Sequence, residues 1–167
     1  MRAFAAGLLL ACSLAASAAD GGAPAFDPQV RGAAAAVGEA SERSLVAELG
    51  VCGGDVPAIS KSAPGLLKAW RKRNKAWLAA SLAVRGELRA SLLGADPAQN
   101  GAIFDRDFEQ AIAGVAQRGA DRLRAIADPA QRKAACEALM SDVREGRRDV
   151  ESVNPGATAM LRHYLDR

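Results

Sequence analysis

Few side chains in this sequence could carry out acid–base or metal chemistry. Asp105, Asp107 and Glu109 lie close together, and paired carboxylates can exchange protons or bind calcium. The run from Asp96 to Asp107 partly matches the calcium-binding loop of an EF-hand, but Ala98 stands where an oxygen ligand is needed. We therefore expect these carboxylates to place favourable charge near the start of a helix and not to hold a metal ion.

The single histidine, His163, lies near the carboxyl terminus. A lone imidazole makes a poor metal site because structural zinc sites use four ligands. The motifs G-x-S-x-G and H-E-x-x-H and a glycine-rich phosphate loop are all missing from the sequence. We accordingly predict no catalytic residue, no metal site and no cofactor. The charged run from Glu145 to Glu151 is typical of ion pairs on an exposed helix face.

Positive charge is densest between Lys61 and Gly94, where eight lysines and arginines accompany one acidic residue, Glu87. Basic residues interleaved with aromatic ones are typical of nucleic-acid-binding proteins. The same charges would also suit an anionic envelope component or an acidic protein surface. The alternative is a solvated surface without a partner. Helical spacing gathers five of these residues into a predicted basic face, which is formed by Lys68, Arg71, Lys72, Lys75 and Arg89.

The opposite side of this stretch is apolar and contains both tryptophans, Trp70 and Trp77. Inward-facing tryptophans cannot stack on bases, which argues against nucleic acid as the partner. Asn74 and Ser81 fall in the same apolar stripe. If they are buried, each needs a hydrogen-bond partner or lines a cavity.

The chain begins with the features of a secretory signal peptide, namely a positive residue, an apolar run and small residues before a cleavage site. We expect residues 1–18 to be removed, with cleavage after Ala18 or Ala19, and the product to be periplasmic or secreted. Residues 19–27 then form a flexible leader and residues 28–167 a single helical domain. The alternative is lipid anchoring through Cys12, because Leu9–Cys12 loosely resembles a bacterial lipobox. The apolar run is shorter than the roughly 20 residues of a spanning helix, so no transmembrane segment is expected after signal removal.

Removal of the signal peptide leaves two cysteines, Cys52 and Cys136. An even pair in an oxidising compartment predicts a disulfide. The bridge would close a long loop and stabilise the fold by roughly 4–5 kcal/mol in the chain-entropy model. The spacing is not C-x-x-C, which argues against a redox role.

Composition predicts an all-α protein, because half the residues are hydrophobic, many of them alanine, and alternating strand patterns are absent. We expect an antiparallel four-helix bundle with a short fifth helix at the C-terminus, stapled by the disulfide. The long helix that starts at Ser62 should be the one on which the others pack. Residues 51–57 should form a turn. The expected helices cover residues 28–49, 62–94, 98–127 and 130–153, followed by a last helix after Asn154.

No set of residues identifies a specific activity. We expect a non-enzymatic binding or accessory protein that turns its basic face toward an anionic envelope component or protein. One alternative is an envelope hydrolase that uses Asp105, Asp107 or Glu109 as acid or base, which requires a raised carboxyl pKa in a cleft. The other is an inhibitor or immunity protein against a secreted toxin or enzyme.

Overall fold

A computed structural model describes residues 27–94 and 96–166, and most of these residues are helical. The signal peptide, Cys12 and residues 19–26 of the predicted leader lie outside the described residues. The described ranges contain no strand, so the predicted all-α class is confirmed. The helices are α1 (Pro28–Asp55), α2 (Pro57–Leu92), α3 (Pro97–Arg124), α4 (Pro129–Arg144), α5 (Val150–Val153) and α6 (Pro155–Leu165).

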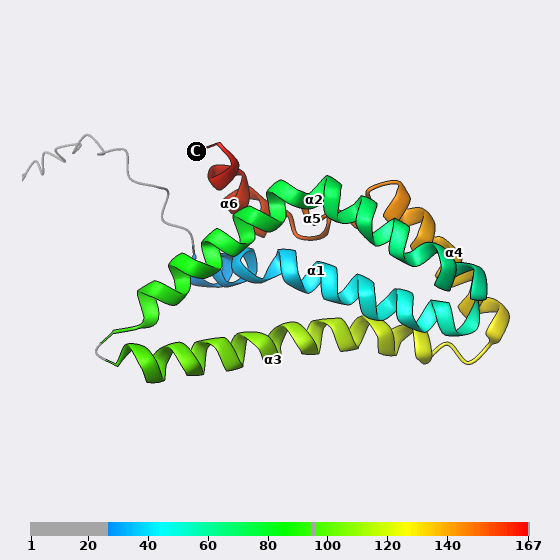
Figure 1. Ribbon diagram of the computed structural model, residues 1–167, viewed down its shortest axis with the longest axis horizontal. Helices are drawn as coiled ribbons and strands as arrows, with labels where there is room; N and C mark the ends of the chain where they lie inside the picture. Colours follow the sequence, from blue (N-terminus) through cyan, green and yellow to red (C-terminus); the bar gives the residue numbers. More distant parts are fainter. Residues whose placement is uncertain (1–26, 95, 167) are drawn as a thin grey trace, which may run out of the picture.

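The centre of the fold is α1 and not the lysine-rich helix. In Figure 1, α1 runs between α2 and α3, and α6 packs on both α1 and α2. Small residues permit these close approaches: a Cβ on Gly38 of α1 would lie 3.0 Å from Cβ of Ser81 on α2. Buried residues occupy several sides of α1, so the helix has no single apolar stripe by which helical periodicity could identify it as central.

The predicted turn at residues 51–57 is wrong, because α1 continues through Gly50 to Asp55 and only Val56 separates it from α2. Gly53 suits this tight link, since a Cβ there would lie 3.3 Å from the Cα of Ser60, which is a close contact. Ser62 does not begin the second helix. Its hydroxyl donates to the carbonyl of Ala58 at 3.0 Å, inside α2.

The fourth helix was expected to reach residue 153, but α4 ends at Arg144. Gly146 has a φ of +79°, a left-handed conformation that favours glycine and commonly follows a helix end. Beyond it, α5 is only four residues long. The regular antiparallel four-helix bundle is therefore not confirmed. The start of the last helix is confirmed, since Asn154 accepts a hydrogen bond from the backbone N–H of Ala157 at 3.0 Å.

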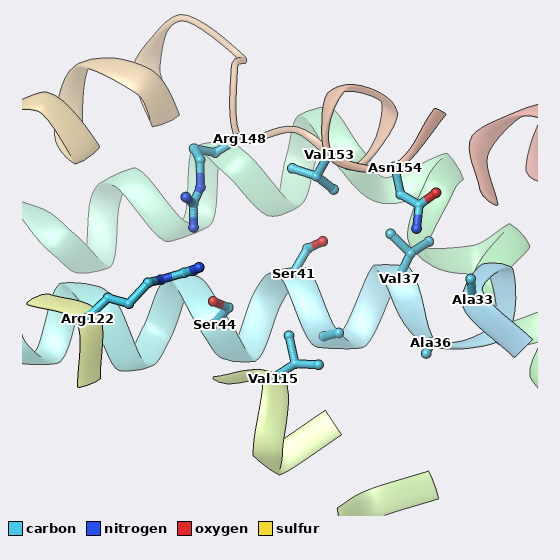
Figure 2. A pocket seen from close by; sticks show the side chains of 11 residues that line it. Ala33, Ala36, Val37, Ser41, Ser44, Val115, Arg122, Arg148, Val153 and Asn154 are labelled. Atoms are coloured by element: carbon cyan, nitrogen blue, oxygen red, sulfur yellow. The ribbon is translucent and has the colours of Figure 1, made fainter. Parts of the chain in front are cut away.

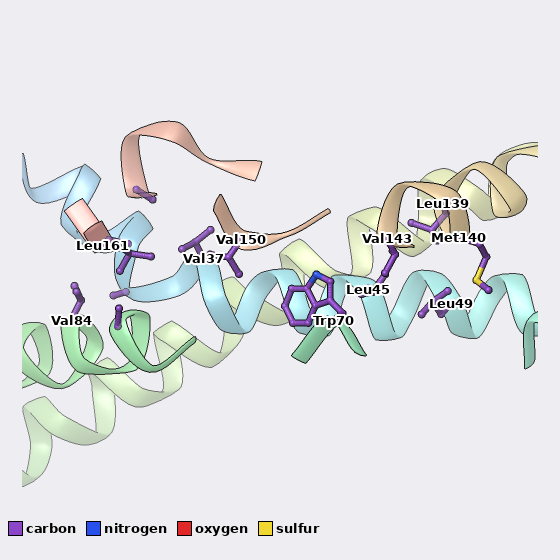
Figure 3. Close-up of a cluster of buried hydrophobic side chains, with 14 of the residues drawn as sticks. Val37, Leu45, Leu49, Trp70, Val84, Leu139, Met140, Val143, Val150 and Leu161 are labelled. Carbon is purple, nitrogen blue, oxygen red and sulfur yellow. The ribbon is translucent and has the colours of Figure 1, made fainter. Parts of the chain in front are cut away.

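The hydrophobic core lies between α1, α2 and α4, with α6 extending it toward the N-terminal half of α1 (Figure 3). Trp70 is its largest fully buried side chain. The predicted disulfide between Cys52 and Cys136 is present and joins the end of α1 to α4. Its sequence separation of 84 residues corresponds to about 4.5 kcal/mol in the chain-entropy model. None of the described helices is both long and apolar enough to cross a bilayer.

Candidate functional site

The five residues of the predicted basic face fall into two groups, arginines with an acidic partner and lysines without one among the described residues. Arg71 forms an ion pair with Glu42 of α1 at 2.7 Å, and Arg89 forms one with Asp105 of α3 at 3.0 Å. These two guanidinium groups therefore already have acidic partners within the protein. The remaining predicted residues, together with Lys61, are exposed and form no ion pair in the parts of the chain that the structure describes. We call these four residues the lysine face: Lys61, Lys68, Lys72 and Lys75.

Arginine and lysine have different roles on α2. The other two arginines are also paired, Arg73 with Asp149 at 3.0 Å and Arg85 with Glu39 at 2.8 Å. A planar guanidinium suits such paired geometry, whereas an ammonium is strongly hydrated and remains in solvent more readily. Spacings of seven, four and three residues place the lysine face within about 60° of the helix surface, over a length of about 21 Å.

The inner side of α2 holds the segment between α4 and α5. Asn74 is 1% exposed and donates to Oδ1 of Asp149 at 2.9 Å, while its own Oδ1 accepts from the N–H of Val150 at 2.8 Å. The indole N–H of Trp70 donates to the carbonyl of Arg148 at 2.9 Å. These contacts fix the backbone on both sides of Arg148. Trp77 is half-buried against the core.

Ser81 is the second polar residue predicted in the apolar stripe. It is 3% exposed, and its hydroxyl donates to the carbonyl of Ala34 at 2.7 Å and accepts from the N–H of Gly38 at 3.2 Å. The burial of Asn74 and Ser81 is therefore accompanied by hydrogen bonds to neighbouring elements. Neither side chain lines the groove described below.

The acidic residues of α3 are paired with arginines. Arg89 donates to both carboxylate oxygens of Asp105 and holds the pKa of that carboxyl below its usual value. Glu109 forms an ion pair with Arg43 at 2.7 Å, and Asp107 is exposed. A general acid at neutral pH needs a raised pKa, which is the opposite of the shift at Asp105. The hydrolase alternative therefore loses support from this residue, and we do not propose it.

His163 is half-buried and lies edge-on to the ring of Tyr164, with ring centroids 6.1 Å apart. Within residues 27–94 and 96–166, no group of three histidine, cysteine or acidic side chains is arranged to hold a metal ion. The described part of the chain thus offers no assembled metal centre around this imidazole.

A groove of about 440 Å³ runs along α1, between α3 and the chain around α5 (Figure 2). We call it the α1 groove. Its floor is formed by small α1 residues, among them Ala33, Ala36 and Ala40, and these short side chains leave the space unfilled. Val115 of α3 and Val153 of α5 line its sides and are 37% and 43% exposed, respectively. The groove therefore presents apolar surface to solvent.

Two arginines, Arg122 and Arg148, lie at the Ser44 end of the α1 groove (Figure 2), and among the described residues they are its only charged lining residues. Nη2 of Arg148 donates to Glu48 at 2.5 Å, and the hydroxyl of Ser44 donates to the same carboxylate at 3.0 Å. Glu48 is 4% exposed and lies against Gly119, where a side chain would overlap it. Across the described residues, Arg122 forms neither an ion pair nor a hydrogen bond, so this end carries uncompensated positive charge.

Sequence reasoning missed the α1 groove. It placed Arg148 among exposed helical ion pairs, but the chain there is not helical, and Arg148 reaches back to Glu48, 100 residues earlier. The available signal was the run of alanines in α1, which fills little volume. No protein-family model, curated protein or solved structure matches this chain.

Proposed function

We propose that the protein is an exported, non-enzymatic binding protein whose lysine face contacts an anionic surface of the envelope. The observation that carries this proposal is the separation of charges on α2: every arginine there has an acidic partner, whereas no lysine has one among the described residues. Four of the five lysines of the whole chain belong to this face. The signal-like start of the sequence and the disulfide support export, because disulfides persist in oxidising compartments.

Anionic lipid headgroups are the partner to test first. A lysine near a negatively charged membrane surface contributes about 1 kcal/mol of attraction. Four lysines therefore supply about 4 kcal/mol, which corresponds to a dissociation constant near 1 mM in accessible lipid. Such binding weakens as salt is added, because the Debye length shortens to about 10 Å at 0.1 M ionic strength.

The test is cosedimentation of the exported protein with vesicles of phosphatidylglycerol and phosphatidylcholine, compared with vesicles of phosphatidylcholine alone. One variant replaces all four residues of the lysine face by glutamine. A control variant removes the same number of positive charges from α3, α4 and α6: Arg106→Gln, Arg118→Gln, Lys133→Gln and Arg162→Gln.

We expect salt-sensitive binding to the anionic vesicles only, about tenfold or more weaker in the lysine-face variant and largely retained in the control. Equal losses in the two variants would show that net charge matters and that the lysine face does not. Absence of wild-type binding to anionic vesicles at low salt would refute lipid headgroups as the partner.

A further inference from the structure

We propose that the α1 groove binds a single-chain anionic amphiphile, a molecule with one alkyl chain and one carboxylate or phosphate headgroup. The apolar floor and sides would receive the chain, and Arg122 and Arg148 would receive the headgroup. This site is separate from the lysine face, and the proposal does not depend on the proposed function.

The dimensions of the α1 groove suit an alkyl chain. Its floor extends from Ala33 to Ser44, over which α1 rises about 16 Å. Its volume of about 440 Å³ lies in the range of small-molecule sites, roughly 300–1,000 Å³. A bound chain would cover Val115 and Val153, which are exposed in the structure. Burial of their apolar surface gives a favourable free energy of binding.

The headgroup end is positively charged and is held in place by the protein. Arg148 neutralises Glu48 through one nitrogen, and the rest of its guanidinium group has no partner among the described residues. Arg122 adds a second guanidinium group at the same end of the groove. Guanidinium groups bind carboxylate and phosphate oxygens with paired hydrogen bonds. The contacts of Trp70 and Asn74 fix the backbone around Arg148 before any ligand arrives, which reduces the entropy lost on binding.

The distribution of polar groups favours an amphiphile over a peptide. A peptide would bring N–H and C=O groups along its whole length, and each needs a partner when it is buried. Among the described residues, the uncharged polar side chains that line the groove are Ser41, Ser44 and Asn154. Ser44 already donates to Glu48, and Oδ1 of Asn154 already accepts from the N–H of Ala157, so few polar groups remain for a peptide backbone. The charged groups are confined to one end, as the single headgroup of an amphiphile requires.

The test is isothermal titration calorimetry of the exported protein with three probes of equal chain length. The two anions are used below their critical micelle concentrations, and dodecanol is used below its solubility limit. Dodecanoate and dodecyl phosphate distinguish a carboxylate headgroup from a phosphate headgroup, and dodecanol lacks the charge. We expect at least one of the two anions to bind with one molecule per protein, more tightly than dodecanol and with a negative heat-capacity change.

Two variants test the two halves of the site. Arg122→Gln should weaken anion binding about tenfold or more, whereas Arg118→Gln, on the same helix but outside the groove lining, should change it less than about twofold. Ala36→Leu should fill the floor and abolish binding, with circular dichroism as the check that the variant folds.

Three results would overturn the proposal: no binding of either anion, equal affinity for dodecanol, or equal effects of Arg118→Gln and Arg122→Gln. The lysine-face variant keeps the α1 groove unchanged and should bind the probes as wild type does. Failure of the vesicle experiment and failure of this titration are therefore distinguishable.

Discussion

Replacement of Asn74 by alanine tests the network that joins α2 to the chain after α4. The amide group of Asn74 donates to the carbonyl of Trp70 at 2.9 Å and to Asp149, and it accepts from the N–H of Val150. Val150 is fully buried. The variant Asn74→Ala leaves the N–H of Val150 without a partner in a site that water does not reach.

The expected cost follows from these contacts. A buried donor left without a partner costs about 1–3 kcal/mol, and each lost hydrogen bond contributes about 1 kcal/mol more. We expect Asn74→Ala to lower the free energy of unfolding by about 3–4 kcal/mol. The control, Asn100→Ala, removes one bond from a half-buried side chain to the carbonyl of Leu93 and should cost about 1 kcal/mol.

The measurement is urea unfolding of the disulfide-bonded protein, followed by circular dichroism. The free energies of unfolding are compared when the variants have the same dependence on urea concentration. Hydrogen exchange adds a local readout, because the amide of Val150 should lose its protection in Asn74→Ala and retain it in Asn100→Ala. The reasoning is refuted if the two variants are equally stable, or if the Val150 amide stays protected without its acceptor.

Two further perturbations have defined outcomes. Replacing Cys52 and Cys136 by serine should lower the unfolding free energy by about 4.5 kcal/mol in urea, and a loss below about 1 kcal/mol would contradict the loop-closure estimate. Arg89→Gln should destabilise the protein at neutral pH, because Arg89 holds the pKa of Asp105 below its usual value of about 3.9. That contribution is present above pH 3.9 and is lost as pH falls through the lowered pKa. Thermal unfolding of both proteins from pH 7 to pH 2 should therefore converge, and a constant difference would exclude this ion pair as the cause.

The sequence predicted the starts of α1, α3, α4 and α6 to within a residue, because these signals are local, whereas α2 begins at Pro57 and not at Ser62. Asp27, Asp96, Asp128 and Asn154 each precede a proline, and each side chain accepts a hydrogen bond from a backbone N–H two or three residues later. An oxygen-bearing residue followed by proline is a strong start signal for a helix. The disulfide was predictable from the cysteine count, since the predicted removal of Cys12 with the signal peptide left one pair.

Helix ends were harder to predict, because a glycine can either lie inside a helix or follow its last residue. Gly50 and Gly53 lie inside α1, whereas Gly146 follows the end of α4. The close approach of Ser60 favours glycine at position 53, and the positive φ favours glycine at position 146. Both causes are tertiary or conformational facts that a single sequence does not contain.

For the site residues too, local features could be predicted and tertiary contacts could not. The exposed lysines of α2 could be recognised from helical spacing, but the partners of Arg71 and Arg89 lie 29 and 16 residues away, respectively, on other helices. The α1 groove was invisible for a further reason. A cavity arises where side chains are too short, and alanine in a helix has the same pattern whether its neighbours fill the space or leave it open.

The bridge between α1 and α4 has a consequence for the order of events during maturation. The full chain has three cysteines, so oxidation can produce three different single pairings, and two of these use Cys12. The predicted removal of residues 1–18 would leave Cys52 and Cys136 with only each other. Thiolates attack disulfides and form new ones, so oxidation before cleavage would allow Cys12 to form a non-native disulfide with Cys52 or Cys136. If the predicted cleavage precedes oxidation, Cys52 and Cys136 can form only one intramolecular disulfide, and no isomerase is needed to correct the pairing.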